Sequence, residues 1–560
     1  MTFHLNIVII VAMIKQEPNI KIIEVYNKKA KTTYLYEDTA YWDPELKQGR
    51  HKRKGIGKLD AKGNPVYNEY YRNRMKQTDE AQKERVVSKT TLLGENLILD
   101  KLIADTGLKQ VLAKTIGKEK ADLCLQLVKH SVCEGKPFYY AEDWLDARGF
   151  KGSALCSQRI TDFFRSLDKD VQNAFYAGWI AKKAEKRSLL FDISSISSYA
   201  KNNPYVEWGY NRDHEKREQI NIALISTYES NTPLWCTELP GSMSDQIALE
   251  YVFDQLEKLD VGKVGLFLDK GFYSEYNIRK LTQKNHRFTI PVPSHLKWQK
   301  EFIDTHRGEL QRPANLIGTE DKDSIIYGLT VVNTTKYGRM WVHLYYDAVR
   351  KERDIASLMA TLNTCKVELE DENPIKSHES LYERYFEVKD TPKRGRKVIL
   401  RHEAVDEYIS GHSGYWMLLS SNEKDTAKAL SQYRSRNDIE LHFDDMKNLM
   451  DCKRIRVHSD DVMQGRIFIN FLAMIVVNEL KRFLSAIPAK ERNYWNHQMI
   501  LNKVATYSRI HYRGKYKDVF SIPTKSQRLI FDLFGIKYDW KGKSVNDEGE
   551  VVPIDEDEEA

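Results

Sequence analysis

The stretch RSLLFDISSISSYA, residues 187–200, begins the run of elements that decides the fold. Short apolar runs bounded by polar residues are typical of buried β-strands. Similar stretches follow at 220–241, which holds two strands, and at 263–274, and a helical pattern, SDQIALEYVFDQLEKL, lies between them. A second helical pattern, SEYNIRKLTQKN, then leads into a strand with the sequence RFTIPVP. The predicted order is strand, strand, strand, helix, strand, helix, strand.

This order predicts an α/β fold with a ribonuclease H-like core, the class that includes the retroviral integrases. After residue 293 the pattern is interrupted by β-prone pieces such as IIYGLTVVNTT and MWVHLYYDAV and by a basic loop. We therefore expect a β-rich insertion domain before the core resumes with a helix near residue 426.

The length of 560 residues allows three or four domains. Residues 20–43 alternate between apolar and polar and predict a β-hairpin, and the apolar run at 466–480 predicts a buried helix. The expected parts are an N-terminal β-hairpin and basic segment (1–75), a helical DNA-binding region (76–185), the first part of the core (186–293), the β-rich insertion (294–425), the rest of the core (426–484), and a helical C-terminal region with an acidic tail (485–560).

Composition excludes several classes of protein. With 41% hydrophobic and 30% charged residues, the chain is typical of a soluble globular protein. Its apolar opening is shorter than the ~20 residues of a membrane span, and we expect residues 1–12 to be dispensable, with translation starting at Met13. Six cysteines without any C-x-x-C pair indicate neither a zinc ribbon nor a disulfide framework and favour a reducing, cytoplasmic location. The glycine spacing at 535–544 does not fit a phosphate loop, so no bound nucleotide is expected.

A basic cluster, KQGRHKRKGIGK, spans residues 47–58 in a chain of net charge +7. Such a run is often a solvated loop, but in a positively charged chain it also suits a polyanion partner such as DNA. We expect contacts with DNA phosphates rather than bases, because no recognition helix is evident. The residues expected to make them are Arg50, Lys52, Arg53 and Lys54, together with His51.

Two aspartates come at the ends of predicted strands, Asp192 in LLFDIS and Asp269 in LFLDKG. Either one alone is more often a turn former or a helix cap. The equivalent ends of adjacent parallel strands lie side by side, however. The two carboxylates could therefore meet at one edge of the sheet.

A third acid lies on a predicted amphipathic helix, YRSRNDIELHFDDMKN, residues 433–448. At about 100° per residue, Tyr433, Arg436, Glu440, Asp444 and Lys447 share one stripe. The apolar residues that could seat this helix on a core are Ile439, Phe443, Met446, Leu449 and Met450. The alternative is a solvated face with an Arg436–Glu440 pair worth about 0.2–0.5 kcal/mol.

Three converging acids, Asp192, Asp269 and Glu440, would repel one another unless divalent cations lay between them. All-oxygen ligands favour Mg²⁺ or Mn²⁺. Two such ions, about 3.5–4 Å apart, can activate a water or a 3′-hydroxyl and stabilise the leaving oxygen in phosphoryl transfer. Arg436 and Lys447 would then meet substrate phosphates. Replacing either by alanine is expected to leave the melting temperature nearly unchanged, since an exposed ion pair is worth little.

The chain resembles the bacterial insertion-sequence DDE transposases, whose glutamate helix carries the signature Y-(2)-R-(3)-E-(6)-K. Tyr433, Arg436, Glu440 and Lys447 match its four spacings without a gap. DKGFYS, which begins at Asp269, is similar to the D-(R/K)-G-(F/Y) segment of that family. GYNRDHEKREQINIALI with the following LPGSMSD is similar to the stretch between its two aspartates, and members also carry a β-rich insertion before the glutamate helix. The resemblance covers roughly residues 185–484.

The resemblance implies cut-and-paste transposition by a metal-dependent enzyme. It implies binding of double-stranded DNA at terminal inverted repeats, strand nicking, hairpin formation at the element ends, and strand transfer into target DNA by a homodimer. The three acids would form the catalytic, metal-binding triad, and the tyrosine, arginine and lysine of the signature would contact DNA. Trp298 and Trp341 are candidates for stacking on a flipped base, although an aromatic residue in a β domain is more often part of a core. Such an enzyme is expected in the cytoplasm, at the nucleoid when bound to DNA.

Two alternatives stay open. A ribonuclease H-like nuclease or resolvase would cut DNA without strand transfer, but the insertion and the four-residue signature argue against it. A domesticated or decayed transposase would bind DNA without cutting it, and the three intact acids disfavour that reading.

Overall fold

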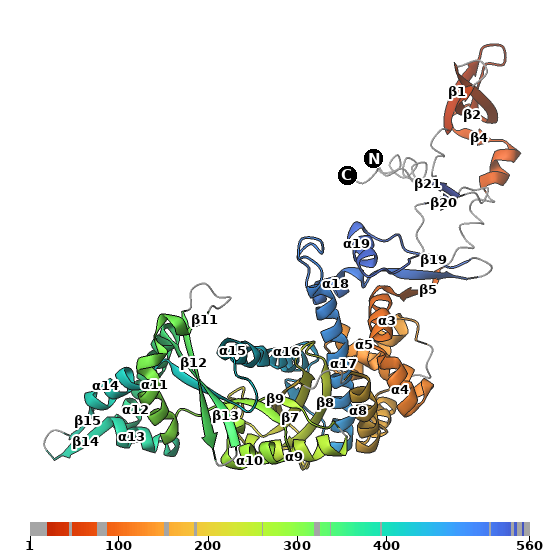
Figure 1. Cartoon of the computed structure of the whole chain (residues 1–560). Helices are drawn as coiled ribbons and strands as arrows, with labels where there is room; N and C mark the ends of the chain where they lie inside the picture. The colour runs from red at the N-terminus through yellow and green to blue at the C-terminus, as the bar shows by residue number, and fades with distance from the viewer. Residues whose placement is uncertain are drawn as a thin grey trace. The chain divides into compact units, whose positions relative to one another are not determined.

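The computed structural model describes residues 20–43, 48–75, 87–150, 156–183, 188–259, 261–317, 325–335, 338–392, 395–513, 517–538, 543–545 and 551–553 (Figure 1). Contacts divide the chain into two compact units. The first comprises Met1–Thr91 and Ser508–Ser521, and the second comprises Leu92–Tyr507 and Ile522–Ala560. The expectations for residues 1–12 and for most of the acidic tail lie outside the described residues.

The first unit contains two small sheets. A four-stranded sheet runs in the order β1 (Ile20–Asn27), β2 (Thr32–Asp43), β3 (Gln48–Leu59) and β4 (Pro65–Tyr67). Its small core is made by Leu35, Ile56 and Tyr71. The second sheet joins β5 (Val87–Leu92), β18 (Ser508–Tyr512) and β19 (Val519–Phe520). The predicted hairpin is confirmed as β1 and β2, which pair antiparallel, whereas the basic cluster forms strand β3 and not a loop.

Helices begin the second unit, as the sequence predicts for the region up to residue 185. They are α3 (Gly94–Thr106), α4 (Leu108–Ile116), α5 (Lys118–Glu134), α6 (Ala141–Ala147), α7 (Ser157–Arg165) and α8 (Lys169–Lys183). The long helix α17 (Asp460–Ser485) packs against α5 and α7. It is buried along most of its length, as predicted for residues 466–480. None of the helices in the described ranges is both long and apolar enough to cross a membrane.

A mixed sheet forms the centre of the second unit. The first five strands of this sheet and the two helices that connect some of them follow one another along the chain. They are β6 (Ser188–Ser198), β7 (Gln219–Thr227), β8 (Pro233–Pro240), α9 (Asp245–Lys258), β9 (Gly265–Phe267), α10 (Glu275–Gln283) and β10 (Arg287–Pro291). This confirms the predicted order along the chain. In space the strands run β8, β7, β6, β9, β10, with β6, β9 and β10 parallel and with β7 antiparallel to both β6 and β8. Every residue of β7 is buried, which explains its nearly continuous apolar sequence.

The region 294–425 is not the separate β-rich domain that the sequence predicts. Strands β11 (Leu316–Ile317), β12 (Ile326–Thr335), β13 (Gly338–Asp347) and β16 (Tyr415–Ser420) extend the central sheet beyond β10. The other elements are α11 (Lys297–Leu310), α12 (Ala348–Glu370), α13 (Glu379–Tyr385), the hairpin of β14 (Phe386–Thr391) and β15 (Gly395–Leu400), and α14 (His402–Gly411). We call residues 348–411 the helical subdomain. It has a core of its own, made by Leu362, Cys365, Leu369, Tyr385, Phe386, Val398 and Val405.

The segment that follows was expected to be one regular helix and instead changes its winding along its length. Helix α15 (Thr426–Arg434) passes through the 3₁₀ turn η5 (Ser435–Asn437) into α16 (Asp438–Asp444), which continues into the π-turn η6 (Asp445–Leu449). We call residues 426–449 the glutamate segment. Its predicted apolar face is largely confirmed, because Ile439, Phe443, Met446 and Met450 are buried.

The C-terminal region after residue 485 was expected to be helical and instead mixes helices with short strands. The glutamate segment leads through β17 (Arg454–Ile455) into α17, and α18 (His497–Val504) and α19 (Lys525–Leu533) follow. Strands β18 and β19 lie between these last two helices, and β20 (Lys543–Val545) pairs with β21 (Val551–Pro553) beyond them.

Candidate active site

Asp192 lies on strand β6, and Asp269 comes two residues after the end of β9, the adjacent parallel strand. β6 and β9 pair with Leu190 opposite Phe267, and each aspartate comes two residues after its member of that pair. The same register therefore places the two carboxylates side by side, as the sequence predicts. One detail differs: Asp192 lies in the middle of β6 and not at its end, because β6 continues alongside β7 as far as Ser198.

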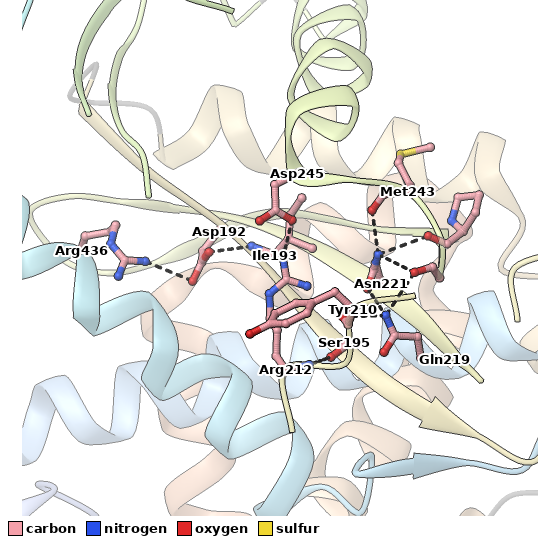
Figure 2. A network of polar contacts seen from close by, with 12 residues as sticks. Asp192, Ile193, Ser195, Tyr210, Arg212, Gln219, Asn221, Met243, Asp245 and Arg436 are labelled. Carbon is pink, nitrogen blue, oxygen red and sulfur yellow. Dashed lines mark hydrogen bonds and ion pairs between the residues drawn. The ribbon is translucent and has the colours of Figure 1, made fainter. Parts of the chain in front are cut away.

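Asp192 is a largely buried carboxylate. Its side chain is 14% exposed, and it accepts hydrogen bonds from the backbone N–H of Ile193 at 2.9 Å and from Nη1 of Arg436 at 3.3 Å (Figure 2). Burial raises the pKa of Asp192 to about 6, Arg436 opposes this rise, and the neighbouring Asp269 adds to it. Ionisation of Asp192 near neutral pH therefore costs free energy, which a bound cation would offset.

Arg436 connects Glu440 to this pair. The guanidinium is 8% exposed and lies between Asp192 and Glu440, with Nη2 3.1 Å from Oε1 of Glu440. The structure therefore brings the three predicted acids together around one arginine. The sequence predicts acids without evident basic partners and assigns Arg436 to substrate phosphates, whereas the structure pairs Arg436 with two of the acids themselves.

Tyr433 contacts the second aspartate from the same segment. Its hydroxyl donates to Oδ1 of Asp269 over 3.4 Å, which makes a long and weak hydrogen bond. Burial and the charge of Asp269 raise the pKa of Tyr433 to about 12, so the hydroxyl remains a neutral donor at physiological pH. Three of the four residues of the signature thus lie at the acids.

Lys447, the fourth, has a different partner. Its Nζ lies 2.8 and 2.9 Å from the two carboxylate oxygens of Asp213, which comes from the loop between β6 and β7. The π-turn begins between Glu440 and Lys447, and its wider winding changes the angles that place both residues on one stripe of a regular α-helix. Within the described part of the chain, no direct contact joins Lys447 to the three acids.

The two aspartates that follow Glu440 also have partners of their own. Asp445 is buried and pairs with Nζ of Lys481 on α17 at 2.7 and 2.8 Å. Asp444 accepts a hydrogen bond from the side chain of Asn448 at 2.6 Å. These partners engage both carboxylates outside the group formed by the three acids.

The sequence analysis did not predict a further ion pair that lies near the three acids. Arg212 pairs with Asp245, the first residue of α9, and its backbone N–H donates to Oγ of Ser195 at 2.8 Å (Figure 2). The charge of Arg212 also lowers the pKa of Asp192. A Cβ atom at Gly271 would lie 2.5 Å from Oδ2 of Asp245, so the glycine of DKGFYS leaves room for this acid. The only signal in the sequence was the stretch between the two aspartates, which carries Arg212 but gives no partner for it.

Two buried amides on β7 fix the loops that carry this pair. Asn221 donates through Nδ2 to the carbonyls of Pro240, Gly241 and Met243 at 3.1–3.3 Å. Gln219 donates through Nε2 to the carbonyl of Tyr210 at 3.0 Å and to Gly241 at 3.1 Å. Figure 2 shows both amides to the right of the Arg212–Asp245 pair. The loops before Arg212 and before Asp245 are thus held by the same strand.

The basic cluster on β3 lies in the first unit, and part of its charge is taken up by acids of β2. The pairs are Arg50 with Asp43 at 3.3 Å, His51 with Asp38 at 2.7 Å and Arg53 with Asp38 at 3.1 Å. Lys54 lies over the ring of Tyr70, 3.7 Å from its centroid. The contact of this cluster with DNA stays a prediction.

The two candidate tryptophans lie in different elements of the 294–425 region. Trp298 is half-buried on helix α11, not in the β-structure expected there, and Trp341 is half-buried on β13. Lys424 and Arg339 lie near the ring of Trp341, 5.7 and 5.5 Å from its centroid. Neither tryptophan contacts the three acids among the described contacts, and the stacking role stays a prediction.

The donors at the acid cluster suit a hard divalent cation. Asp192, Asp269 and Glu440 offer only carboxylate oxygens, the ligands that Mg²⁺ and Mn²⁺ prefer. The raised pKa of the buried Asp192 shows that the single charge of Arg436 does not offset its desolvation. The residues present therefore fit a divalent metal ion.

Comparisons with known proteins cover both aspartates and the glutamate segment. A family model described as "Transposase DDE domain" matches residues 186–476. Among solved structures, the chain is similar to a piggyBac transposase synaptic complex with hairpin DNA, with 13% identity over 82% of this chain and 85% of that chain. The TM-score of 0.36 is too low for this likeness to establish a common fold. No curated protein sequence matches the chain.

Proposed function

The chain belongs to the transposase DDE domain family and is a DNA-cleaving transposase enzyme, and we propose that it is the transposase of a bacterial insertion sequence. It binds the terminal inverted repeats of its element, cuts the DNA strands at the element ends, closes those ends as hairpins and joins them to target DNA. The observation that supports this assignment best is the meeting of Asp192, Asp269 and Glu440 around Arg436.

The catalytic core is proposed to be ribonuclease H-like. The spatial order β8, β7, β6, β9, β10 supports this, with the antiparallel β7 next to the central β6 and with β9 and β10 parallel to β6. In such an arrangement the acids on β6 and after β9 face the glutamate segment from adjacent strands. This arrangement supports a joint role for three residues that are distant in the sequence.

Enzymes of this family depend on divalent metal ions, and Asp192, Asp269 and Glu440 would hold them here. We propose Mg²⁺ or Mn²⁺, two ions per site. When bound, the ions supply charge that polarises the scissile phosphate and lowers the pKa of an attacking water or 3′-hydroxyl.

The residues of the chain contribute orientation and charge to this reaction. Asp192 is ionised above its raised pKa of about 6, so it serves as a ligand near neutral pH. Arg436 pairs with Asp192 through Nη1 and with Glu440 through Nη2, which fixes the spacing of the two carboxylates. Tyr433 donates to Asp269 and orients that carboxylate.

DNA contacts are proposed for residues around this centre. Lys447 holds the loop that carries Asp213 and lies beside the path of the DNA strand, and the basic strand β3 binds duplex phosphates. Trp298 or Trp341 stacks on a base that leaves the helix when a hairpin forms. The active complex is a homodimer on two element ends.

A single assay separates this proposal from a simple nuclease and from a DNA-binding remnant. The full chain is incubated with a duplex that carries one end of the element and with a supercoiled target, in Mg²⁺, Mn²⁺ or EDTA. A transposase yields cut ends, hairpins and joined products with either metal and none in EDTA. Cut ends without joined products would identify a nuclease, and a shifted but uncut duplex would identify a binding protein.

A further inference from the structure

A second group of metal-binding side chains lies in the helical subdomain. Cys365, Glu368 and His378 each offer a ligand atom, and these three atoms lie within 4.8 Å of one another. Cys365 and Glu368 are one turn apart on α12, and His378 ends the 3₁₀ turn η4 (Lys376–His378) that follows this helix. Residues from two elements therefore converge on one point.

The environment of these side chains is ordered and partly closed to solvent. The Cys365 side chain is fully buried in the subdomain core, and the side chains of Glu368 and His378 are 13% and 28% exposed. Nδ1 of His378 lies 2.8 Å from Oε2 of Glu368, and the hydroxyl of Tyr382 donates to the same oxygen at 2.5 Å. Tyr382 also accepts a hydrogen bond from the backbone N–H of Ile375 at 3.0 Å, which ties the turn to the carboxylate.

The ligand chemistry differs from that of the three catalytic acids. A thiolate, an imidazole and a carboxylate together suit Zn²⁺, which binds sulfur, nitrogen and oxygen in tetrahedral geometry at about 2.0–2.3 Å. The three ligand atoms lie within 4.8 Å of one another here, and the ligand atoms around a bound Zn²⁺ are closer together than that. Small side-chain movements would therefore close the group around an ion. Mg²⁺ would not take the buried sulfur.

We propose that Cys365, Glu368 and His378 form a zinc site, with water as the fourth ligand and with Tyr382 as a hydrogen-bonding partner that orients Glu368. The bound ion joins the C-terminal half of α12 to η4 and so braces the helical subdomain. A brace of this kind is valuable in a small subdomain, where seven of the described residues form the buried core. Binding releases the thiol proton of Cys365 to solvent, and no electron transfer is involved.

The test is a titration of the full chain, stripped of metal by EDTA and dialysed, with Co²⁺ in excess Mg²⁺. Co²⁺ replaces Zn²⁺ in such sites, and a thiolate ligand gives an intense near-ultraviolet charge-transfer band that carboxylate ligands do not give. We expect one Co²⁺ per chain to produce the band and Zn²⁺ to abolish it by displacement. Mg²⁺ occupies the catalytic acids, so their failure to bind metal would not alter this result.

Variants assign the band to its ligands. Cys365→Ala should abolish it. Tyr382→Phe, which removes a hydrogen bond to Glu368, should weaken Co²⁺ affinity by about 10-fold to 100-fold, and His378→Ala, which removes a ligand itself at a partly exposed position, should weaken it by at least as much. Cys156→Ser is the matched control, because Cys156 is an exposed free thiol, and it should leave the band unchanged. If Cys365→Ala fails to fold, His378→Ala and Tyr382→Phe decide the assignment.

Three results would overturn the proposal. They are the absence of a charge-transfer band in the wild-type chain, a band that persists in folded Cys365→Ala, and full affinity in both His378→Ala and Tyr382→Phe. A rise in melting temperature with Zn²⁺ in the wild type, but not in Cys365→Ala, would support the bracing role. An equal rise in both chains would contradict it.

Discussion

Arg436 and Lys447 belong to the same glutamate segment but have different electrostatic surroundings. Arg436 is shared by two acids, Asp192 and Glu440, and Asp269 lies beside the first of them. Lys447, in the π-turn, forms a one-to-one pair with Asp213. Negative charge therefore exceeds positive charge at the Arg436 end and is balanced at the Lys447 end. The signature is therefore not one uniform basic face, and the excess of acid marks where divalent cations would bind.

Neutralising the acids near Arg436 and the acid that pairs with Lys447 should give the largest difference in cleavage activity. We expect Asp192→Asn and Asp269→Asn to lower strand cleavage and strand transfer together by several orders of magnitude, because each removes a carboxylate that we propose as a metal ligand. Asp213→Asn is the matched control, since it removes an acid from the Lys447 end and should lower cleavage far less. The measurement is single-turnover cleavage of an element-end duplex in Mg²⁺, with DNA binding measured alongside. Equal losses in all three variants would show that the acids beside Arg436 have no special role in cleavage.

The pH dependence of the free energy of unfolding should show that burial disfavours the ionisation of Asp192. The pKa of Asp192 is raised from 3.8 to about 6, so the folded chain binds this proton more tightly than the unfolded chain does. Its contribution to the free energy of unfolding is therefore greatest below about pH 4 and falls as pH rises to about 6. At about 1.4 kcal/mol per pKa unit, the fall amounts to no more than about 3 kcal/mol.

Asp192→Asn should abolish that fall and make the metal-free chain relatively more stable at pH 7. The check is denaturant unfolding of both chains in EDTA from pH 4 to pH 7, with the difference between them plotted against pH. A flat difference for Asp192→Asn would show that burial does not disfavour the ionisation of Asp192.

Replacing Arg436 and Lys447 by alanine should separate the roles of the two side chains in stability. The sequence predicts nearly unchanged melting temperatures for both alanine variants, but Arg436 is 8% exposed and Lys447 12% exposed. Arg436→Ala should cost about 1–3 kcal/mol at pH 7, because it leaves a buried carboxylate without its charged partner. Lys447→Ala should cost about 1 kcal/mol or less, because Asp213 can turn to solvent. Chemical denaturation measures both, and a larger loss for Lys447→Ala would reverse the comparison.

The basic strand extends the contrast between paired and unpaired cations to DNA binding. Arg53 has an acidic partner in Asp38, whereas the exposed Lys52 has no acidic partner among the described residues. Removing a cation that binds one duplex phosphate should flatten the log–log dependence of binding on salt by about 0.9. We expect Lys52→Ala to flatten it more than Arg53→Ala, as measured by titration with non-specific duplex DNA. Unchanged slopes in both variants would show that β3 is solvated and does not bind DNA phosphates.

Much of the core followed from local patterns. The order of elements from β6 to β10, the buried face of the glutamate segment and the apolar helix α17 were all predictable, because apolar periodicity reports burial directly. The proximity of Asp192 and Asp269 was also predictable, because equivalent positions on adjacent parallel strands are neighbours. These features depend on residues close in sequence or on one simple pairing rule.

Other features depend on contacts that no local pattern reports. The strands of the 294–425 region look like a separate β domain by composition, but their edges pair with β10 and not only with one another. The π-turn at Asp445–Leu449 has no evident local signal, and it accompanies the buried Asp445–Lys481 pair with α17. Likewise, Arg212 could be seen in the sequence, but Asp245 was not identified as its partner until the fold placed it there.

We propose that Asp192, Asp269 and Glu440 act together as metal ligands in DNA cleavage. Glu440 tests it most cleanly, because its side chain is 57% exposed and Glu440→Gln should fold and bind element ends normally while losing the ligand charge. The decisive measurement is the single-turnover rate of strand cleavage by Glu440→Gln in Mg²⁺ on an element-end duplex. We expect a rate several orders of magnitude below that of the wild type with unchanged DNA binding. Cleavage at the wild-type rate by the purified variant would contradict it.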